Sequence, residues 1–272
     1  MSKIEDALKR ALTVRENIPP GNVSPTLKSS TTLALLSSEP AAGRDIARMV
    51  EPTVLGRSVL GRKRIVYPGI ANNAVVNAFR QLRTRLLQVS EGRSMALMVT
   101  SARSGSGASF TALNLAAAFA FDDTKTALLI DCNLHDAGLN GLLYSKSEFG
   151  LIDYLEQNTT EVEEVIQPSG IPRLRWIPAG RRREMTTEVF TSALMRDLFQ
   201  DLKNRYSDRY IIVDAPPITK SADAEILSDF CDYVLLVVPY GKATESQILA
   251  AARAIDEKKL LGVVFNNEPY YG

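Results

Sequence analysis

A segment rich in glycine and serine contains the residues best suited to bind a phosphate group. Between the apolar run Met95–Ser101 and a helical pattern, it comprises Arg103, Ser104, Gly105, Ser106, Gly107, Ala108 and Ser109. A glycine-rich turn before a helix binds phosphate through backbone N–H groups, because the helix N-terminus carries a partial positive charge. A turn without a ligand has the same composition, so the neighbouring residues must decide between the two interpretations.

Two acidic residues end apolar runs further along the chain. Asp131 closes the run Thr126–Asp131, and Asp214 closes the run Tyr210–Asp214. The carboxyl ends of parallel strands meet at one edge of a sheet, where ligands bind. Each acid, considered alone, could instead cap a helix or be solvated in a loop. Next to the glycine-rich segment, the two acids predict a nucleotide–magnesium site, with the Ser109 hydroxyl as a further candidate Mg²⁺ ligand.

The segment lacks a basic residue at its end. Phosphate-binding loops of the P-loop type end in Gly-Lys-Ser or Gly-Lys-Thr, and the lysine reaches the β- and γ-phosphates. The corresponding triplet here is Gly107-Ala108-Ser109. An alanine supplies no cation, so we expect the binding of ATP or ADP with Mg²⁺ to be reduced without being excluded.

The elements that must position these residues alternate along the chain. Strands are expected at 95–101, 126–131, 174–178, 210–214, 233–239 and 260–266, and helices at 73–89, 107–121, 149–157, 187–206, 221–229 and 244–258. Most strand runs are apolar without polar alternation, as in a parallel sheet that helices cover on both faces. The alternation predicts an α/β fold of three layers, with a mostly parallel, doubly wound sheet.

The first 70 residues differ in composition from the rest. Residues 1–15 have apolar side chains at helical spacing and predict a short amphipathic helix, which suits docking to a partner. Residues 16–70 are rich in proline, serine and threonine and predict a largely disordered linker. We expect the folded P-loop-like domain to span 71–266, followed by a tail at 267–272.

The composition excludes several classes of function. With 32 Lys and Arg against 31 Asp and Glu, the net charge of +1 argues against a generally basic nucleic-acid-binding protein. Two cysteines and one histidine are too few for a Cys/His metal centre, which needs about four ligands. The N-terminus lacks a signal-peptide pattern and no apolar run reaches about 18 residues, so we expect a cytoplasmic protein.

Three other features have simple structural interpretations. Cys132 and Cys231 lie in apolar runs and are predicted to be buried free thiols. Trp176, in a strand run, is predicted to lie in the core. The basic triplet Arg181–Arg183 could meet phosphates, anionic lipid or an acidic partner, although a solvated surface is the simpler interpretation.

Residues 70–266 resemble the cytoplasmic domain of the bacterial tyrosine autokinases of capsule and exopolysaccharide synthesis, which are deviant P-loop ATPases. The motifs that carry the resemblance are Ala78–Thr84, Ser101–Ser109, Leu128–Asp131, Gly150–Leu155, Pro178–Gly180, Ile211–Pro217, Asp223–Ala224 and Val237–Thr244. Their order and spacing match those of the family. The start of the chain, Ser2–Leu8, is similar to stand-alone members from exopolysaccharide clusters.

The resemblance implies an activity and the residues that would carry it out. In that family the loop binds ATP, and the acids that correspond to Asp131 and Asp214 serve catalysis and Mg²⁺. The helix that carries Arg80 and Arg83 joins neighbouring subunits into a ring. A tyrosine-rich tail is phosphorylated in trans, and the kinase works with a membrane polysaccharide co-polymerase that controls chain length and export.

The sequence departs from the family pattern at several positions. Ala108 replaces the loop lysine, Asn133 the second acid of the Asp-x-Asp-x-Arg motif, His135 its arginine, and Asn77 the glutamate of the oligomerisation motif, while the tail offers only Tyr270 and Tyr271. An amide at Asn133 can orient a hydroxyl group but cannot accept its proton. Arg103 falls where positioning ATPases carry an additional lysine. It could contact a phosphate or simply lie exposed.

These departures favour a relative of the autokinases that is catalytically weak or inactive. It would act as a regulator or scaffold of polysaccharide chain-length control and export, through a membrane co-polymerase or an active kinase paralogue at the inner face of the plasma membrane. A homo-oligomer is compatible with this function, and nucleic acid is not an expected partner. Two alternatives stay open: an active ATP-dependent autokinase that uses Arg103 or a neighbouring subunit, and a positioning-type ATPase that dimerises on nucleotide.

Overall fold

The computed structural model describes residues 51–70, 74–122, 124–134, 138–144, 149–157, 161–181, 187–205 and 208–268. The helix expected at 1–15, the first part of the expected linker and most of the expected tail lie outside these residues. Among the described residues, no helix has both the length and the apolar character needed to cross a membrane.

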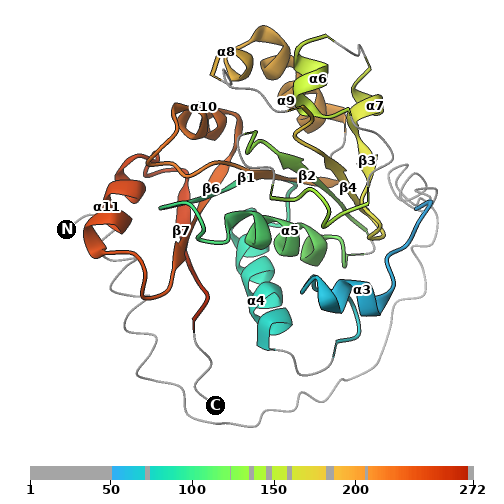
Figure 1. Ribbon diagram of the computed structural model, residues 1–272, viewed down its shortest axis with the longest axis horizontal. Helices are drawn as coiled ribbons and strands as arrows, with labels where there is room; N and C mark the ends of the chain where they lie inside the picture. The colour runs from blue at the N-terminus through green and yellow to red at the C-terminus, as the bar shows by residue number, and fades with distance from the viewer. Residues whose placement is uncertain are drawn as a thin grey trace, which may run out of the picture.

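One sheet forms the centre of the described structure (Figure 1). Its strands are β1 (Ala96–Ser101), β2 (Thr126–Asp131), β3 (Gln167–Pro168), β4 (Leu174–Ile177), β5 (Arg209–Asp214), β6 (Tyr233–Pro239) and β7 (Leu260–Asn266). They lie in the order β3-β4-β2-β5-β1-β6-β7. All neighbours run parallel except β3 and β4. The predicted mostly parallel α/β fold is confirmed, and the short antiparallel β3 is the strand that the sequence did not predict.

Helices cover both faces of this sheet. The described helices are α3 (Arg57–Arg62), α4 (Ala74–Val89), α5 (Ala108–Phe119), α6 (Leu151–Leu155), α7 (Val162–Val165), α8 (Thr187–Phe190), α9 (Ala193–Arg205), α10 (Ala222–Phe230) and α11 (Glu245–Arg253). Helices α3, α4 and α5 pack on one face and α6 to α11 on the other (Figure 1). Each face has its own apolar core, because alternate strand residues such as Met98 and Val99 point to opposite sides.

Two predicted helices are shorter or interrupted for local reasons. The helix expected at 187–206 breaks into α8 and α9, since the Ser192 hydroxyl accepts the Met195 N–H at 3.1 Å and caps the start of α9. The helix expected at 244–258 ends at Arg253. The Asp256 side chain and carbonyl then accept the N–H groups of Lys258 and Lys259 and turn the chain into β7.

The last part of the expected linker, residues 51–70, is folded, which corrects that boundary. Leu60, Ile65 and Val66 are buried in the core on the α5 side of the sheet. The Val66 N–H donates to Asn114 Oδ1 at 2.8 Å, inside that core. The correction has a physical reason: a few apolar residues, when buried, offset the entropy cost of ordering a segment whose average composition is that of a loop.

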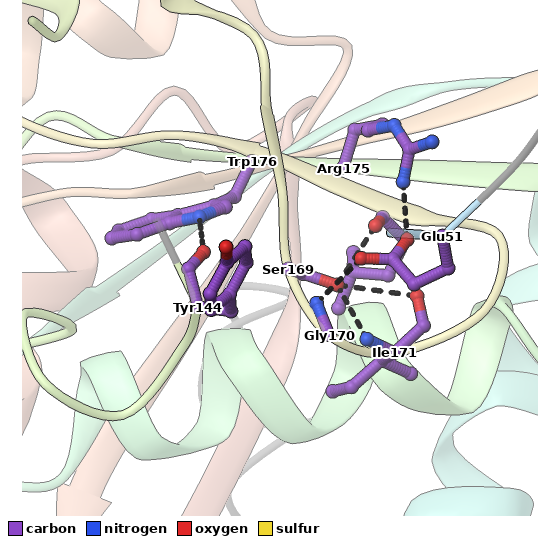
Figure 2. A network of polar contacts seen from close by, with 8 residues as sticks. Glu51, Tyr144, Ser169, Gly170, Ile171, Arg175 and Trp176 are labelled. Atoms are coloured by element: carbon purple, nitrogen blue, oxygen red, sulfur yellow. Dashed lines mark hydrogen bonds and ion pairs between the residues drawn. The ribbon is translucent and has the colours of Figure 1, made fainter. Parts of the chain in front are cut away.

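The N-terminal end of this folded segment is tied to the turn between β3 and β4 (Figure 2). Glu51 forms an ion pair with Arg175, and its other oxygen accepts the Gly170 N–H at 2.8 Å. The Leu55 N–H donates to the Gly170 carbonyl at 2.8 Å. The segment is therefore held by directed polar contacts as well as by apolar burial.

Trp176 lies in the core, as predicted, with 1% of its surface exposed. Its Nε1–H donates to the Tyr144 carbonyl at 2.8 Å (Figure 2). The Tyr144 N–H in turn donates to the Ser169 carbonyl. The indole thus joins β4 to the chain that follows β2, which also satisfies its buried polar group.

Both cysteines are buried free thiols, as predicted, and we expect neither to react while the protein is folded. Burial raises the pKa of Cys231 to about 12. Burial, with the negative charges of Asp131 and Asp214, raises the pKa of Cys132 well above its ordinary value. The thiolate is the reactive species. A disulfide compound that reacts with exposed thiols at about pH 8 should therefore modify neither cysteine until the chain is unfolded. Rapid labelling of the folded protein would contradict this expectation.

The raised pKa of Cys231 also predicts how the stability of the protein changes at high pH. The thiol of Cys231 has a pKa of about 12 in the folded protein, against an ordinary value of 9.0. Between these values the unfolded chain binds fewer protons than the folded chain, so the free energy of unfolding falls as the pH rises.

Candidate functional site

In the loop between β1 and α5, the Arg103 carbonyl is hydrogen-bonded to two side chains of the protein. The hydroxyls of Ser101 and Ser106 donate to the Arg103 carbonyl at 3.0 and 2.6 Å. In a planar trans peptide the N–H points opposite to the carbonyl. The N–H of Ser104, which shares the peptide with the Arg103 carbonyl, is therefore directed away from these hydroxyls.

Two carbonyls at the end of the loop also accept hydrogen bonds from side chains. Asn266 Nδ2 donates to the Ser106 carbonyl at 2.9 Å, and the Thr111 hydroxyl donates to the Gly107 carbonyl at 2.9 Å. By the same geometry, the N–H groups of Gly107 and Ala108 point away from these side-chain donors. The loop thus combines carbonyl groups that are bonded within the protein with N–H groups at the start of a helix, which is the arrangement that binds an anion.

Two glycines of the loop have backbone conformations that side chains disfavour. Gly105 has a φ of 74° and Gly107 a φ of 85°. A Cβ atom on Gly107 would lie 2.1 Å from Asn266 Nδ2. The left-handed backbone therefore favours glycine at 107, and any larger residue would also have to displace the Asn266 amide from its present position.

Ala108 is the first residue of α5 and directly follows Gly107. It is partly buried and packs against the apolar core on this face of the sheet. Its methyl group brings no charge to the helix N-terminus. The neighbouring Ser109, also partly buried, lies in the first turn of the helix. The loop consequently presents backbone N–H groups and a serine hydroxyl, but no cation at this position.

The two predicted acids lie side by side. Asp131 ends β2 and Asp214 ends β5, and the two residues are direct partners in the parallel register. Neighbouring strands are about 4.8 Å apart, so the carboxylates come from adjacent backbone positions. Both residues are fully buried. The sheet order also places β1 next to β5, so the glycine-rich loop and both acids share one edge of the sheet.

Asn133 lies directly beside the first of these acids. Its backbone N–H donates to Asp131 Oδ1 at 3.1 Å. The backbone of the preceding residue, Cys132, donates to the Asp214 carbonyl at 2.9 Å. The segment that follows β2 is therefore anchored to β5, and its residue 133 is an asparagine rather than an acid.

The turn after β5 holds the base of the loop. The Thr100 hydroxyl donates to the Pro216 carbonyl at 2.6 Å, and the Thr219 hydroxyl donates to the Ala102 carbonyl at 3.0 Å. The Ile218 N–H donates to the Ser101 carbonyl at 3.1 Å. These contacts place the Asp-Ala-Pro-Pro turn next to the loop, so that a shift of one segment would move the other.

Arg103 lies exposed at the rim of the loop. Its Nη1 donates to the Lys242 carbonyl at 2.7 Å, in the turn between β6 and α11. This contact brings a second basic residue, Lys242, to the neighbourhood of the loop, while the side chain of Arg103 is directed toward that turn.

Helix α4 carries the predicted oligomerisation residues, and they differ in their surroundings. Asn77 and Arg80 are exposed. Arg83 is partly buried and forms an ion pair with Asp122 at 3.4 Å. Val75 and Val89, near the two ends of the helix, are among the few exposed large apolar side chains of the described residues. Arg80 is therefore accessible to another subunit, whereas Arg83 already contacts its own chain.

The Gly150–Leu155 motif packs against the Pro-Ala-Gly turn. The fully buried Asp153 accepts the Gly150 N–H at 2.9 Å and lies 3.2 Å from Arg181 Nε. A Cβ on Gly180 would come within 2.5 Å of Asp153 Oδ2. Arg181, the first arginine of the basic triplet, thus pairs with a buried carboxylate even though 69% of its side chain is exposed.

Several predicted residues lie outside the described part of the chain. They are His135, Arg182, Arg183, Tyr270 and Tyr271. Their roles stay predictions.

Asn266 is the site residue that the sequence analysis missed. It is the last residue of β7, and its contact with the loop joins positions 160 residues apart. One signal was available: a polar residue at the end of a predicted strand lies at the same edge of the sheet as Asp131 and Asp214.

Comparison with known proteins shows clear relatives, although no family model matches the chain. The tyrosine-protein kinase CpsD of Streptococcus agalactiae serotype III is 30% identical over 191 residues, which cover 69% of this chain and 80% of the relative. The tyrosine-protein kinase YwqD of Bacillus subtilis is 32% identical over 193 residues, with 70% and 80% of the two chains covered.

The fold is similar to that of a solved kinase domain. The kinase domain of the Escherichia coli tyrosine kinase ETK has a TM-score of 0.66 and 27% identity, over 81% of this chain and 92% of that one. The mostly parallel sheet with helices on both faces is thus the architecture of that kinase domain.

Proposed function

Because the chain belongs to the bacterial tyrosine-protein kinases, we propose that it is a nucleotide-binding member with weak or no kinase activity. In this proposal it serves exopolysaccharide or capsule biosynthesis as a cytoplasmic regulator or scaffold. The observation that carries it is the loop between β1 and α5, which keeps the backbone geometry for an anion but has the methyl group of Ala108 at the position of the cation.

Backbone contacts support the retention of nucleotide binding. The N–H groups of Ser104, Gly107 and Ala108 are directed away from the side chains that hold their peptides. Together with the N-terminus of α5, they suit the phosphates of ATP or ADP. Asp131, Asp214 and Ser109 are oxygen donors of the kind that Mg²⁺ prefers. When bound, Mg²⁺ would neutralise charge on the phosphates.

Two side chains support the proposal that catalysis is weak. Ala108 supplies no positive charge where charge shifts during phosphoryl transfer, and loss of one preorganised group of this kind typically costs about 10²–10³-fold in rate. Asn133 lies next to Asp131 and cannot accept a proton from a tyrosine hydroxyl. Asp131 is the carboxylate left for that task, but it lies fully buried beside Asp214.

The surface of α4 supports an assembly role. Arg80 is exposed, and so are Val75 and Val89 near the two ends of the helix, so basic and apolar side chains of α4 are accessible to another protein. The occupants that fit the proposal are a second copy of the chain, an active kinase paralogue or a membrane polysaccharide co-polymerase. Such a partner would place the chain at the inner face of the plasma membrane.

An active autokinase is the second candidate, and the exposed position of Arg103 at the rim of the loop favours it. If a bound nucleotide drew the Arg103 side chain away from the Lys242 carbonyl, a rim cation would reach the phosphates. This candidate requires phosphate transfer to Tyr270 or Tyr271.

The assay that separates these candidates uses the purified chain with Mg²⁺ and ATP, followed by mass spectrometry of the tail peptide. We expect phosphate on Tyr270 and Tyr271 to stay close to the background of a matched Asp131→Asn variant. Phosphorylation that depends on Mg²⁺ and is lost in Asp131→Asn would establish the active autokinase instead. Dimerisation on ATP without phosphorylation, measured by light scattering, would favour a positioning-type ATPase.

A further inference from the structure

Asn266 is held rigidly next to the loop. Its backbone belongs to the end of β7, where it pairs with Pro239 of β6. Its carbonyl accepts the Tyr240 N–H at 2.8 Å. Since the backbone is part of the sheet and the residue is partly buried, the side chain starts from a well-defined position.

The side-chain amide of Asn266 contacts the peptide between Ser106 and Gly107. Its Nδ2 donates to the Ser106 carbonyl at 2.9 Å. The same nitrogen lies so close to Gly107 that a Cβ there would be only 2.1 Å away. The amide group therefore fixes the orientation of the Ser106–Gly107 peptide and occupies the space beside its glycine.

We propose that Asn266 is a positioning residue for phosphate binding, which sets the direction of the Gly107 N–H toward a bound polyphosphate. The proposal rests on the proposed nucleotide binding and deepens it. The Gly107 N–H belongs to the peptide whose carbonyl Asn266 holds, so loss of the amide donor would free that peptide to rotate. Glycine at 105 and 107, both at positive φ, offers little resistance to such a rotation.

The absence of a lysine at residue 108 makes the contact between Asn266 and the loop more important for phosphate binding. In a loop with a lysine, a charged side chain provides part of the attraction for the phosphates. Here Ala108 provides no charge, so the directed backbone N–H groups contribute a larger share of the attraction for the phosphates. An asparagine also suits the position chemically, because it donates a hydrogen bond without adding charge, whereas an aspartate would place negative charge beside the anion and lose the donor.

Three variants of the full chain test the proposal: Asn266→Ala, Asn266→Asp and the control Asn267→Gly. The control alters the exposed neighbour, whose φ of 61° a glycine adopts freely. Binding of Mg²⁺·ATP and of inorganic pyrophosphate is measured by calorimetry, and thermal unfolding is measured without ligand. Because one neutral hydrogen bond contributes about 1 kcal/mol, we expect Asn266→Ala to bind about 5-fold more weakly. Asn266→Asp should bind more weakly still, and Asn267→Gly should match the native chain.

A second measurement separates positioning from a general structural role. In the native chain, pyrophosphate should shift the amide resonance of Gly107, and in Asn266→Ala this shift should be largely lost. A lower melting temperature with unchanged affinity and an unchanged Gly107 shift would overturn the proposal, because Asn266 would then only stabilise the fold.

The same comparison in an Ala108→Lys background distinguishes failure of this proposal from failure of the proposed function. If the native chain binds nucleotide too weakly to measure, the Asn266 variants are compared in that background, where a weaker affinity supports the role. Equal affinity with and without Asn266 overturns the positioning role alone. Absence of binding in both backgrounds overturns nucleotide binding and the positioning role with it.

Discussion

Ala108→Lys is expected to strengthen the binding of Mg²⁺·ATP by about 10- to 100-fold. A hydrogen bond to a charged group contributes about 1.5–3 kcal/mol, which corresponds to that range of affinities. The position suits a lysine, because residue 108 begins α5 next to the Gly107 N–H. The apolar contacts of Ala108 leave a surface against which the methylene groups of a lysine can lie while the ammonium group reaches the phosphates.

Calorimetry with ATP and ADP measures this effect, and Ala108→Met is the matched control. Methionine has a similar length and no charge, so it separates the cation from the added volume. We expect Ala108→Met to bind no more tightly than the native chain. Native binding as tight as that of Ala108→Lys would contradict the weakened site.

Kinase activity should require a second change. Ala108→Lys alone leaves an amide at residue 133, so the task of accepting the proton still falls to the fully buried Asp131. The double variant Ala108→Lys/Asn133→Asp is expected to raise tail phosphorylation by about 10²-fold or more over the native chain, as estimated from the typical cost of losing one catalytic group. Failure of the double variant, with nucleotide binding restored, would show that the chain lacks more than these two side chains.

Glu51→Ala is expected to lower the free energy of unfolding by about 3 kcal/mol, since breaking one side of a buried ion pair typically costs about 3–5 kcal/mol. The side chains of Glu51 and Arg175 are only 5% and 15% exposed. The substitution removes the carboxylate from Arg175 and also removes the acceptor of the Gly170 N–H (Figure 2). Because Leu55 packs on Gly170, the change should also loosen the segment before α3.

Chemical denaturation measures the loss, with Arg93→Ala as the control. Arg93 pairs with Glu91 on the surface, where the two side chains are 75% and 76% exposed. An exposed pair contributes about 0–1 kcal/mol, so the control should change little. If Glu51→Ala were as mild as Arg93→Ala, the contact between residues 51–55 and the β3–β4 turn would not stabilise the domain.

The strands and the loop were predictable because their signals are local. The apolar runs that became β1, β2 and β6 lack polar alternation, and the structure buries nearly all of their residues. Gly105 and Gly107 precede a helical pattern, and Asp131 and Asp214 end strands. The departure at Ala108 was likewise visible, since it depends only on the residue that follows Gly107.

The folding of residues 51–70 was not predictable from composition. Prolines and polar residues dominate the average of the expected linker, whereas the burial of Leu60, Ile65 and Val66 depends on a surface that α4 and α5 provide. A few apolar residues stabilise a segment only when they can be buried against such a complementary surface. Its presence is a property of the assembled core rather than of the segment.

The sequence by itself therefore determined the parallel α/β architecture, the glycine-rich loop and the two acids, because periodicity and strand ends can be recognised from neighbouring residues. The tertiary structure decided which distant side chains support them. Asn266 reaches a loop carbonyl 160 residues away, and Glu51 pairs with a side chain 124 residues away. Such contacts arise where the sheet order brings strand ends and chain segments together, and no local spacing encodes that proximity.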